Sequence, residues 1–174
     1  MDSYTVIVVI FGIIILLLLV GVFFINRLSI YNNKVKSSLV TVSGHLEARM
    51  ELIDQMINFI NNNLEHEKSY VTKLKHVDKY IKEFLEENSN FKGFSKNEKE
   101  FLNFIRLDEN YSFLKKNKEY LKLKEEVLAN QERLVYALDS YDKGVVDYNN
   151  YRSNKFILFL SKLFGFPEYD CYSK

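Results

Sequence analysis

The stretch YTVIVVIFGIIILLLLVGVFFI, residues 4–25, is a run of 22 residues without a charged side chain. A helix of this length extends about 33 Å, close to the ~30 Å hydrocarbon core of a bilayer. Lipid offers the backbone no hydrogen-bond partner, so the run is predicted to be helical in spite of its β-branched residues. We therefore expect a transmembrane helix over residues 4–26, after a short tail of residues 1–3. Side chains that we assign to this membrane anchor are Tyr4, Phe11, Leu16, Leu19, Phe23, Phe24 and Ile25.

Two other readings of this run compete with a membrane anchor. A cleaved secretory signal needs a basic start, a shorter apolar core and an Ala-x-Ala type of cleavage site. Here the start is Met-Asp-Ser, and the apolar run is long and leads into Phe-Phe-Ile-Asn. The third reading is a helix buried in a soluble core. We favour the uncleaved anchor.

The basic residues near the ends of the run predict its orientation. None precedes it, whereas Arg27, Lys34 and Lys36 follow it closely. The positive-inside rule then places the N-terminus outside the cell and the rest of the chain in the cytoplasm.

Composition narrows the classes of protein that this chain can represent. Among its 174 residues are 24 basic and 23 acidic side chains, one Pro, six Gly and the single Cys171. One Cys excludes an intrachain disulfide framework and a cysteine-rich zinc site. A formal net charge of +1 gives no support to electrostatic binding of nucleic acid. Few Pro and Gly suit long helices better than a turn-rich β fold.

From Leu28 to Leu64 the apolar residues recur three and four positions apart, as on one face of a helix. No Pro separates this segment from the membrane run, so the transmembrane helix is predicted to continue into it. Asn61, Asn62 and Asn63 favour a turn. Either one bent helix continues to about Asn88 or two helices meet near residues 61–63. We favour the break, and both readings stay open.

Residues 86–95 (EENSNFKGFS) are predicted to form a loop, and Ser95 and Glu98 fit a capping box at the start of the next helix. That helix is expected to turn Phe101, Leu102 and Ile105 inward. Farther along, Tyr111 or Leu114 is a further candidate for the core. The last long helix is the most regular, with apolar residues three and four apart from position 120 to 148 and Gln131 at the one missing position.

Four amphipathic segments with short links predict an all-α fold in which the transmembrane helix continues into an antiparallel four-helix bundle. We place the bundle domain at residues 27–155 and an apolar C-terminal tail at residues 156–174. The most apolar part of the tail, residues 156–166 (FILFLSKLFGF), is too short to span a membrane. It is expected either to cap the bundle or to lie in the headgroup region near the anchor.

Five stretches after the apolar run have a distinctive order and spacing. They are residues 31–36 (YNNKVK), 46–53 (LEARMELI), 65–68 (EHEK), 141–149 (YDKGVVDYN) and 163–166 (LFGF). Together with the N-terminal anchor, they resemble the LemA family of bacterial membrane-anchored helical proteins. The residues in these motifs that we take as structural or partner-binding are Tyr31, Asn32, Leu46, Arg49, Leu52, Ile53, His66, Glu67, Tyr141, Tyr148, Asn149, Phe164, Gly165 and Phe166.

The chain also departs from the family pattern. Asp54 stands where the family usually has Pro after Leu-Ile, which weakens any expectation of a proline kink. Asp142 takes the place of an Asn, and a Phe-Pro before the terminal apolar stretch is replaced around residues 154–156. The resemblance implies an anchored helical bundle, and it brings no catalytic residues with it.

A search for chemistry finds no phosphate-binding glycine loop and no nucleophile elbow. His45, His66 and His76 are too scattered for a convincing metal site, so we predict no metal, no cofactor and no catalytic residue. We expect all three histidines to lie on solvated helix surfaces.

Polar and aromatic residues at core spacing carry two further predictions. Arg49 lies on the apolar face of its helix, so we expect a structural ion pair, with snorkelling as the alternative. Candidate partners are Asp139, Asp142 and Asp147.

We expect the tyrosines at positions 120, 141 and 148 to be core residues. The alternative is that the region around residues 141–151 forms a polar and aromatic seam that docks a partner.

We therefore predict a scaffold or partner-binding protein in the bacterial cell membrane, crossing it once and without enzymatic activity. Its expected partners are the lipid bilayer and other membrane proteins, with no nucleic acid, and a homo-oligomer is compatible with the sequence. The alternative is an accessory or regulatory subunit of a membrane-bound protease or envelope stress system.

Overall fold

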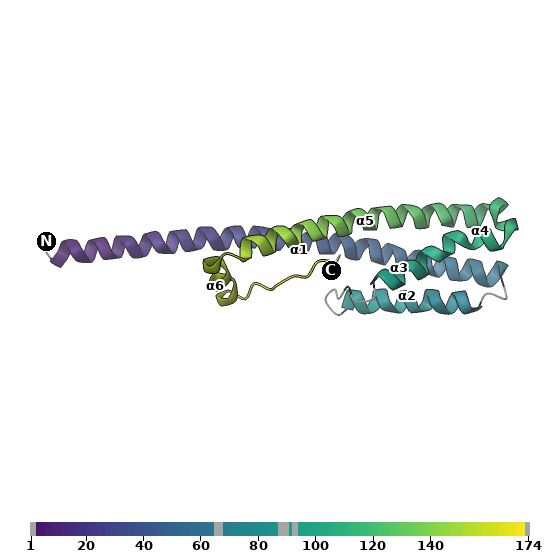
Figure 1. The fold of residues 1–174 in the computed structure, drawn as a ribbon, viewed down its shortest axis with the longest axis horizontal. Helices are drawn as coiled ribbons and strands as arrows, with labels where there is room; N and C mark the ends of the chain where they lie inside the picture. Colours follow the sequence, from purple (N-terminus) through teal and green to yellow (C-terminus); the bar gives the residue numbers. More distant parts are fainter. Residues whose placement is uncertain (1–2, 65–67, 87–90, 92–93, 173–174) are drawn as a thin grey trace. The chain divides into compact units, whose positions relative to one another are not determined.

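The structure is a computed structural model that describes residues 3–64, 68–86, 91 and 94–172. All regular elements of these residues are helical, which confirms the predicted all-α class (Figure 1). In chain order they are α1 (Ser3–Asn63), α2 (Lys68–Glu86), α3 (Phe94–Leu102), η1 (Asn103–Arg106), α4 (Leu107–Asn110), η2 (Ser112–Lys116), α5 (Lys118–Arg152) and α6 (Lys155–Leu163).

The chain divides into two compact units. Unit 1 consists of Met1–Ser38 and Ser140–Lys174, and unit 2 consists of Leu39–Asp139. The long helices α1 and α5 each contribute residues to both units. A single antiparallel four-helix bundle therefore stays a prediction.

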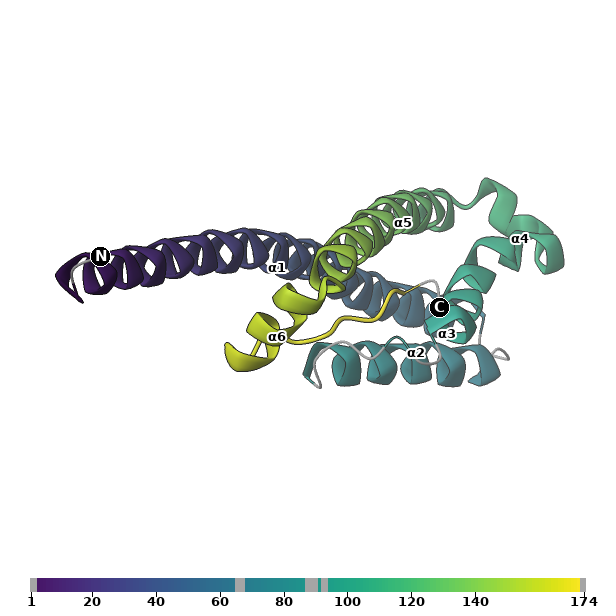
Figure 2. The same cartoon turned by 60° about the vertical axis from the view of Figure 1, so that its left-hand side comes forward.

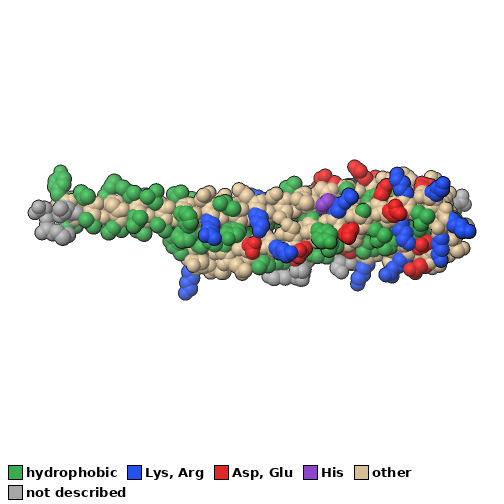
Figure 3. Space-filling model, turned by 90° about the horizontal axis from the view of Figure 1, so that it is seen from above, with side chains coloured by type: hydrophobic (Ala, Val, Ile, Leu, Met, Phe, Trp, Pro, Cys, Tyr) green, Lys and Arg blue, Asp and Glu red, His purple; other side chains and the backbone are tan. Residues whose placement is uncertain are grey.

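The first part of α1 has the length and apolar character needed to cross a membrane. None of its most apolar 18-residue window is buried, and large apolar side chains from Tyr4 to Phe23 are exposed. In the space-filling view, hydrophobic side chains line this part of α1, and charged ones appear only farther along the chain (Figure 3). Phe24 and Ile25 differ from the other anchor residues, because both are half-buried.

The break predicted near the asparagines is confirmed. Helix α1 ends at Asn63, whose side-chain amide donates to the carbonyl oxygen of Phe59 at 2.9 Å. Helix α2 begins at Lys68 and ends at Glu86, where the loop was expected. It buries Leu74, Val77, Ile81 and Phe84, which recur at helical spacing.

The segment after the loop is less regular than the sequence predicted. Helix α3 begins at Phe94, one residue before the expected Ser95, and gives way to 3₁₀ helix at Asn103. A 3₁₀ helix has three residues per turn instead of 3.6, so the change at Asn103 alters which side chains face inward. The buried residues of this segment recur three apart at first. They are Phe101, Phe104 and Leu107, followed by Leu114. The inward positions predicted for Leu102 and Ile105 were wrong, because both are only half-buried.

Helix α5 is continuous over its 35 residues, as its apolar spacing predicted. Its first part belongs to the core of unit 2 through Tyr120, Leu123, Val127, Leu134 and Leu138. Its last part forms the core of unit 1 with residues of α1 and α6. The unit 1 core residues are Leu28, Val35, Tyr141, Val145, Tyr148, Ile157 and Leu160.

Candidate functional site

Arg49 of α1 is the centre of a buried polar cluster in unit 2. Only 2% of its surface is exposed. Its Nε donates to Oδ1 of Asn130 at 3.0 Å, and its Nη2 donates to Oε1 of Gln131 at 2.6 Å. Its Nη1 forms an ion pair with Glu98 of α3. The guanidinium carbon also lies 4.1 Å from the ring centroid of Phe101, in a cation–π contact. We call these five residues the arginine centre.

The arginine centre links three helices of unit 2. Asn130 uses its amide as well, donating from Nδ2 to the backbone carbonyl oxygen of His45 at 3.0 Å. Because a buried guanidinium is costly without partners, this arrangement fixes α1, α3 and α5 against one another. The hydrogen bonds and the ion pair of the arginine centre all join residues of this protein, which indicates a structural role.

The predicted ion pair of Arg49 exists, but all three candidate partners were wrong. Asp139 is exposed, Asp142 accepts a hydrogen bond from the backbone N–H of Tyr172, and Asp147 pairs with Lys34 at 3.1 Å. The snorkelling alternative is also wrong, because the guanidinium does not reach solvent.

The sequence pattern does not predict Glu98, Asn130 and Gln131 as partners of Arg49. It predicts a capping box for Glu98, whereas the carboxylate of Glu98 pairs with Arg49. The available signal was Gln131, a polar residue at a core position of α5, just as Arg49 is a charged residue on the apolar face of α1. Two polar residues on separate apolar faces are a reason to consider that they meet.

A second cluster, in unit 1, holds the end of the chain against α5. Tyr148, Asn149 and Tyr141 donate hydrogen bonds from their side chains to backbone carbonyl oxygens. Their acceptors and distances are Pro167 at 2.6 Å, Tyr169 at 2.8 Å and Asp170 at 3.1 Å, respectively. Figure 1 shows the acceptor segment as the extended chain after α6.

Two further residues complete this cluster, which we call the C-terminal seam and define as Asn32, Tyr141, Asp142, Tyr148 and Asn149. Oδ1 of Asn32, on α1, accepts from the Tyr169 hydroxyl at 2.9 Å. Oδ1 of Asp142 accepts from the Tyr172 backbone N–H at 2.6 Å. The seam thus supplies both donors and acceptors to residues 167–172.

Burial raises the pKa values of the seam tyrosines. It raises the pKa of Tyr141 to about 12, with a smaller contribution from the negative charge of Asp142. Burial also raises the pKa values of Tyr148 and Tyr169 above the ordinary tyrosine value. Each phenol therefore stays protonated to a higher pH than an ordinary tyrosine, and only the protonated hydroxyl can donate to a carbonyl.

The core assignment of the tyrosines is confirmed, since Tyr120, Tyr141 and Tyr148 are buried. In unit 2, burial raises the pKa of Tyr120 to about 12, and its hydroxyl donates to the carbonyl oxygen of Phe104 at 3.1 Å. The alternative, a polar and aromatic seam that docks a partner, stays a prediction; in this structure Tyr141, Tyr148 and Asn149 of that region bond the C-terminal segment of the same chain.

The LFGF motif ends helix α6 and starts the extended segment. Gly165 has φ of 69°, in the left-handed region that favours glycine. The backbone N–H of Phe166 donates to the carbonyl of Ser161 at 2.8 Å, and that of Gly165 donates to Lys162 at 3.4 Å. These two bonds form a Schellman motif, so the glycine terminates the helix.

The remaining predicted residues divide into core, surface and undescribed positions. Leu46, Leu52 and Ile53 are buried in unit 2. Tyr31 is half-buried, with its ring centroid 5.1 Å from that of Tyr151 in unit 1. His66 and Glu67 lie outside the described residues.

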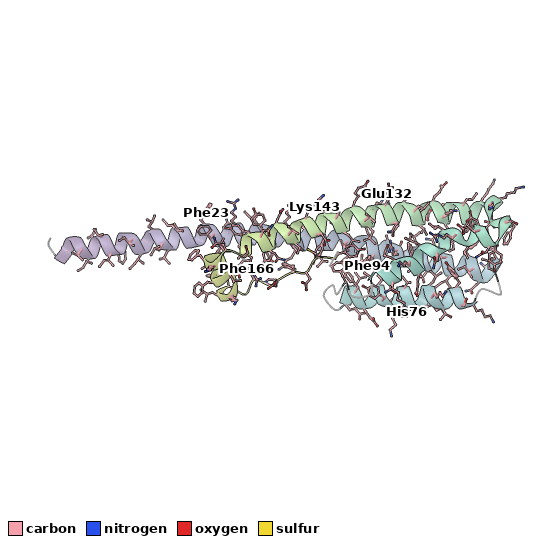
Figure 4. All side chains as sticks on the ribbon, viewed as in Figure 1. Phe23, His76, Phe94, Glu132, Lys143 and Phe166 are labelled. Carbon is pink, nitrogen blue, oxygen red and sulfur yellow. The ribbon has the colours of Figure 1, made fainter. Side chains whose placement is uncertain are left out.

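Of the other two histidines, His45 is half-buried, so its expected place on a solvated surface was only partly right. His76 is exposed, as expected, and its Nδ1 lies 4.0 Å from the Glu100 carboxylate. In the described part of the chain, no three His, Cys, Asp or Glu residues gather in a way that could hold a metal ion. Figure 4 shows His76 on α2.

Replacing Arg49 by Met is expected to destabilise the protein by roughly 3–5 kcal/mol, because it leaves the largely buried Glu98 without its counter-charge. Thermal unfolding of the detergent-solubilised full chain, followed by far-ultraviolet circular dichroism, measures the effect. Adding Glu98→Gln should recover part of the loss.

The matched control is Lys34→Met, which breaks the exposed Lys34–Asp147 pair and should cost less than about 1 kcal/mol. Equal losses in the Arg49 and Lys34 variants would contradict a stabilising role for the arginine centre.

Tyr141→Phe is expected to remove one phenol that ionises near pH 12 in a titration followed by phenolate absorbance. The folded-state pKa lies above the unfolded value of about 10, so this burial stabilises the fold below pH 10 and the stabilisation is lost as pH rises through 12. The variant should therefore lose less stability over that interval than the parent. Tyr120→Phe removes a second late phenol, in unit 2, and the double variant should lose both. An unchanged late step in Tyr141→Phe would contradict the burial of this hydroxyl.

Comparison with protein-family models gives one match, the LemA family, over residues 38–174. The comparisons with curated proteins and with solved structures found no match. The matched region contains the arginine centre and every C-terminal seam residue except Asn32, and it excludes the stretch around Tyr31 that also suggested the resemblance. Since it covers well over half of the 174 residues, the chain belongs to the LemA family.

Proposed function

We propose that this protein is a membrane-anchored helical scaffold or partner-binding protein of the LemA type, without catalytic activity of its own. The observation that supports it best is the continuity of α1. One helix carries the exposed apolar segment and then the core positions from Leu28 to Ile60. An anchor of this kind confines the protein to a surface and raises its effective concentration toward other membrane components.

The absence of catalysis is supported by how the buried polar side chains are used. In the arginine centre, Glu98, Asn130 and Gln131 all bond Arg49. In the C-terminal seam, the side chains bond the end of the same chain. A catalytic site needs polar groups that converge on a substrate instead.

A partner surface is supported by an apolar row on α5 within unit 2. Leu121, Leu128 and Val135 are exposed and recur every seven residues, and exposed Tyr136 adjoins them. A seven-residue repeat keeps side chains on one face of a helix, the arrangement used when two helices pair. We propose that a helix of another membrane protein docks here.

We further propose that the protein lies in the bacterial cell membrane, with its N-terminus outside and the residues after Arg27 in the cytoplasm. The support is the positive-inside rule, applied to Arg27, Lys34 and Lys36.

A photoreactive amino acid at position 128, activated in intact membranes and followed by mass spectrometry, tests the partner surface. The expected result is covalent capture of one defined membrane protein, lost when Leu121 and Val135 are both changed to Asp. The control position is the exposed Arg133, five residues on and about 140° around the helix. Equal capture from positions 128 and 133, or capture that survives the Asp changes, would contradict the proposal.

The identity of the captured protein separates the candidate functions. Capture of another copy of this chain would indicate a homo-oligomer. If the partner is a membrane-bound protease whose turnover changes when this protein is added to a reconstituted mixture, the accessory-subunit alternative replaces the scaffold.

Orientation is tested with a single cysteine at position 133, whose native Arg is exposed and lies off the docking row, in a Cys171→Ser background. A membrane-impermeant maleimide should label this cysteine only after the cells are broken. Labelling in intact cells would show that the bundle faces outward.

A further inference from the structure

Helix α6 has two apolar faces, and unit 1 covers only one of them. Ile157, Leu160 and Ser161 are buried. Phe156, Phe159 and Leu163 form the other face, and Phe159 and Leu163 are 63% and 65% exposed. A helix that is apolar on both sides belongs in an apolar environment, and in water this face would be a contiguous hydrophobic patch. The exposed Phe164 extends it beyond the helix end.

The position of α6 beside α1 identifies the environment. The ring centroid of Phe156 lies 5.7 Å from that of Phe24, in an edge-to-face contact within unit 1. Phe24 is one of the last residues of the 22-residue apolar run and precedes Arg27, the first basic residue. Figures 1 and 2 both draw α6 next to this part of α1, and Figure 4 places Phe23 and Phe166 in the same region.

The exposed face of α6 is held in place by both ends of the helix. Asn154 caps the start, accepting from the backbone N–H of Phe156 at 3.0 Å, and Gly165 terminates the helix. Ser161 on the packed face accepts from Nε of Arg152 at 3.2 Å. The helix therefore cannot turn its second apolar face into unit 1 without losing the packing of the first.

The charges around this face suit a lipid surface. Lys155 and Lys162 are the only charged residues of α6, and both are exposed, as is Arg27 on α1. An apolar face flanked by Lys is the arrangement of helices that lie in the plane of a membrane interface. Lys side chains there can reach the phosphate groups of anionic lipids.

We propose that α6 is an interfacial membrane helix. Its exposed apolar face inserts at the boundary between headgroups and acyl chains, in the leaflet where α1 leaves the hydrocarbon, with Lys155 and Lys162 at the phosphates. The inference deepens the proposed membrane anchoring and rests on it. It gives unit 1 a second attachment to the bilayer, so that unit 1 is held at the membrane surface instead of swivelling freely on a single helix.

The chain has no Trp, so single Trp residues report depth without background. The full-length protein would be reconstituted into vesicles of phosphatidylcholine and phosphatidylglycerol, with lipids brominated at shallow or deep acyl positions to quench Trp emission. The three variants are Leu16→Trp in the apolar run, Phe159→Trp on α6 and Val146→Trp on α5.

Val146→Trp is the matched control, because it replaces another exposed apolar residue of unit 1. The ion pair between Lys34 and Asp147 places its part of α5 beside residue 34 of α1. That is ten residues past Phe24, or about 15 Å along the helix.

We expect deep bromines to quench the Trp at position 16 most strongly and shallow bromines to quench the Trp at position 159, at a depth of about 5–10 Å into the interface. Lipid bromines should leave the emission of the Trp at position 146 unchanged. Quenching at position 16 but not at position 159 would overturn the interfacial helix and leave the anchor intact. A blue-shifted, unquenched Trp at position 159 would show that a protein surface covers α6, which also overturns the proposal.

Quenching at position 159 without quenching at position 16 would support the interfacial helix and contradict the transmembrane anchor.

Discussion

Hydrocarbon cannot hydrogen-bond a peptide group, so a segment able to cross a membrane must satisfy its own backbone, and the first part of α1 does so as a helix. The apolar run carries Val, Ile and Phe, which have modest helix propensity in water, yet inside a bilayer the helix is the conformation that satisfies their backbone. The run ends near Phe24 and Ile25, but the helix continues to Asn63. What changes at Arg27 is the side chains, from apolar on all sides to a stripe that begins at Leu28.

A stripe alone specifies poorly how far one helix slides along another, because apolar contacts are non-directional. Each unit adds a polar pairing between α1 and α5, which is buried in unit 2 and exposed in unit 1. In unit 2 it is Arg49 with Asn130 and Gln131, and in unit 1 it is Lys34 with Asp147. The buried pairing carries the greater penalty for misalignment, since a guanidinium moved off its partners would stay desolvated without compensation.

The sequence predicts features that repeat or interrupt a period. The exposed apolar run of α1, the break after Asn63, the long regular α5 and the burial of Arg49 all follow from apolar spacing and from residues that depart from it. Phe104 and Leu107 were missed because a single regular α-helix would place Phe101, Leu102 and Ile105 on one side, whereas the chain changes to 3₁₀ helix at Asn103 and turns Phe104 inward instead. The partner of Arg49 was missed because Glu98 belongs to a helix whose approach to α1 depends on the path of an intervening loop.

The bonds of the C-terminal seam could not be predicted from the sequence for a different reason, because most of them do not join two side chains. Three of its bonds run from Tyr148, Asn149 and Tyr141 to backbone carbonyls, and a carbonyl is present at every position of a chain. These bonds hold an extended segment whatever most of its side chains are, and Pro167 is acceptable as an acceptor because it retains its carbonyl.

The same reasoning explains why Asp142 can stand where the family pattern has Asn. The partner of this side chain is a backbone N–H, of Tyr172, so an acceptor is all that the site requires. The oxygen of an Asn and the carboxylate of an Asp can both provide one. The carboxylate also gives a charge-assisted bond, which strengthens the last contact of the seam.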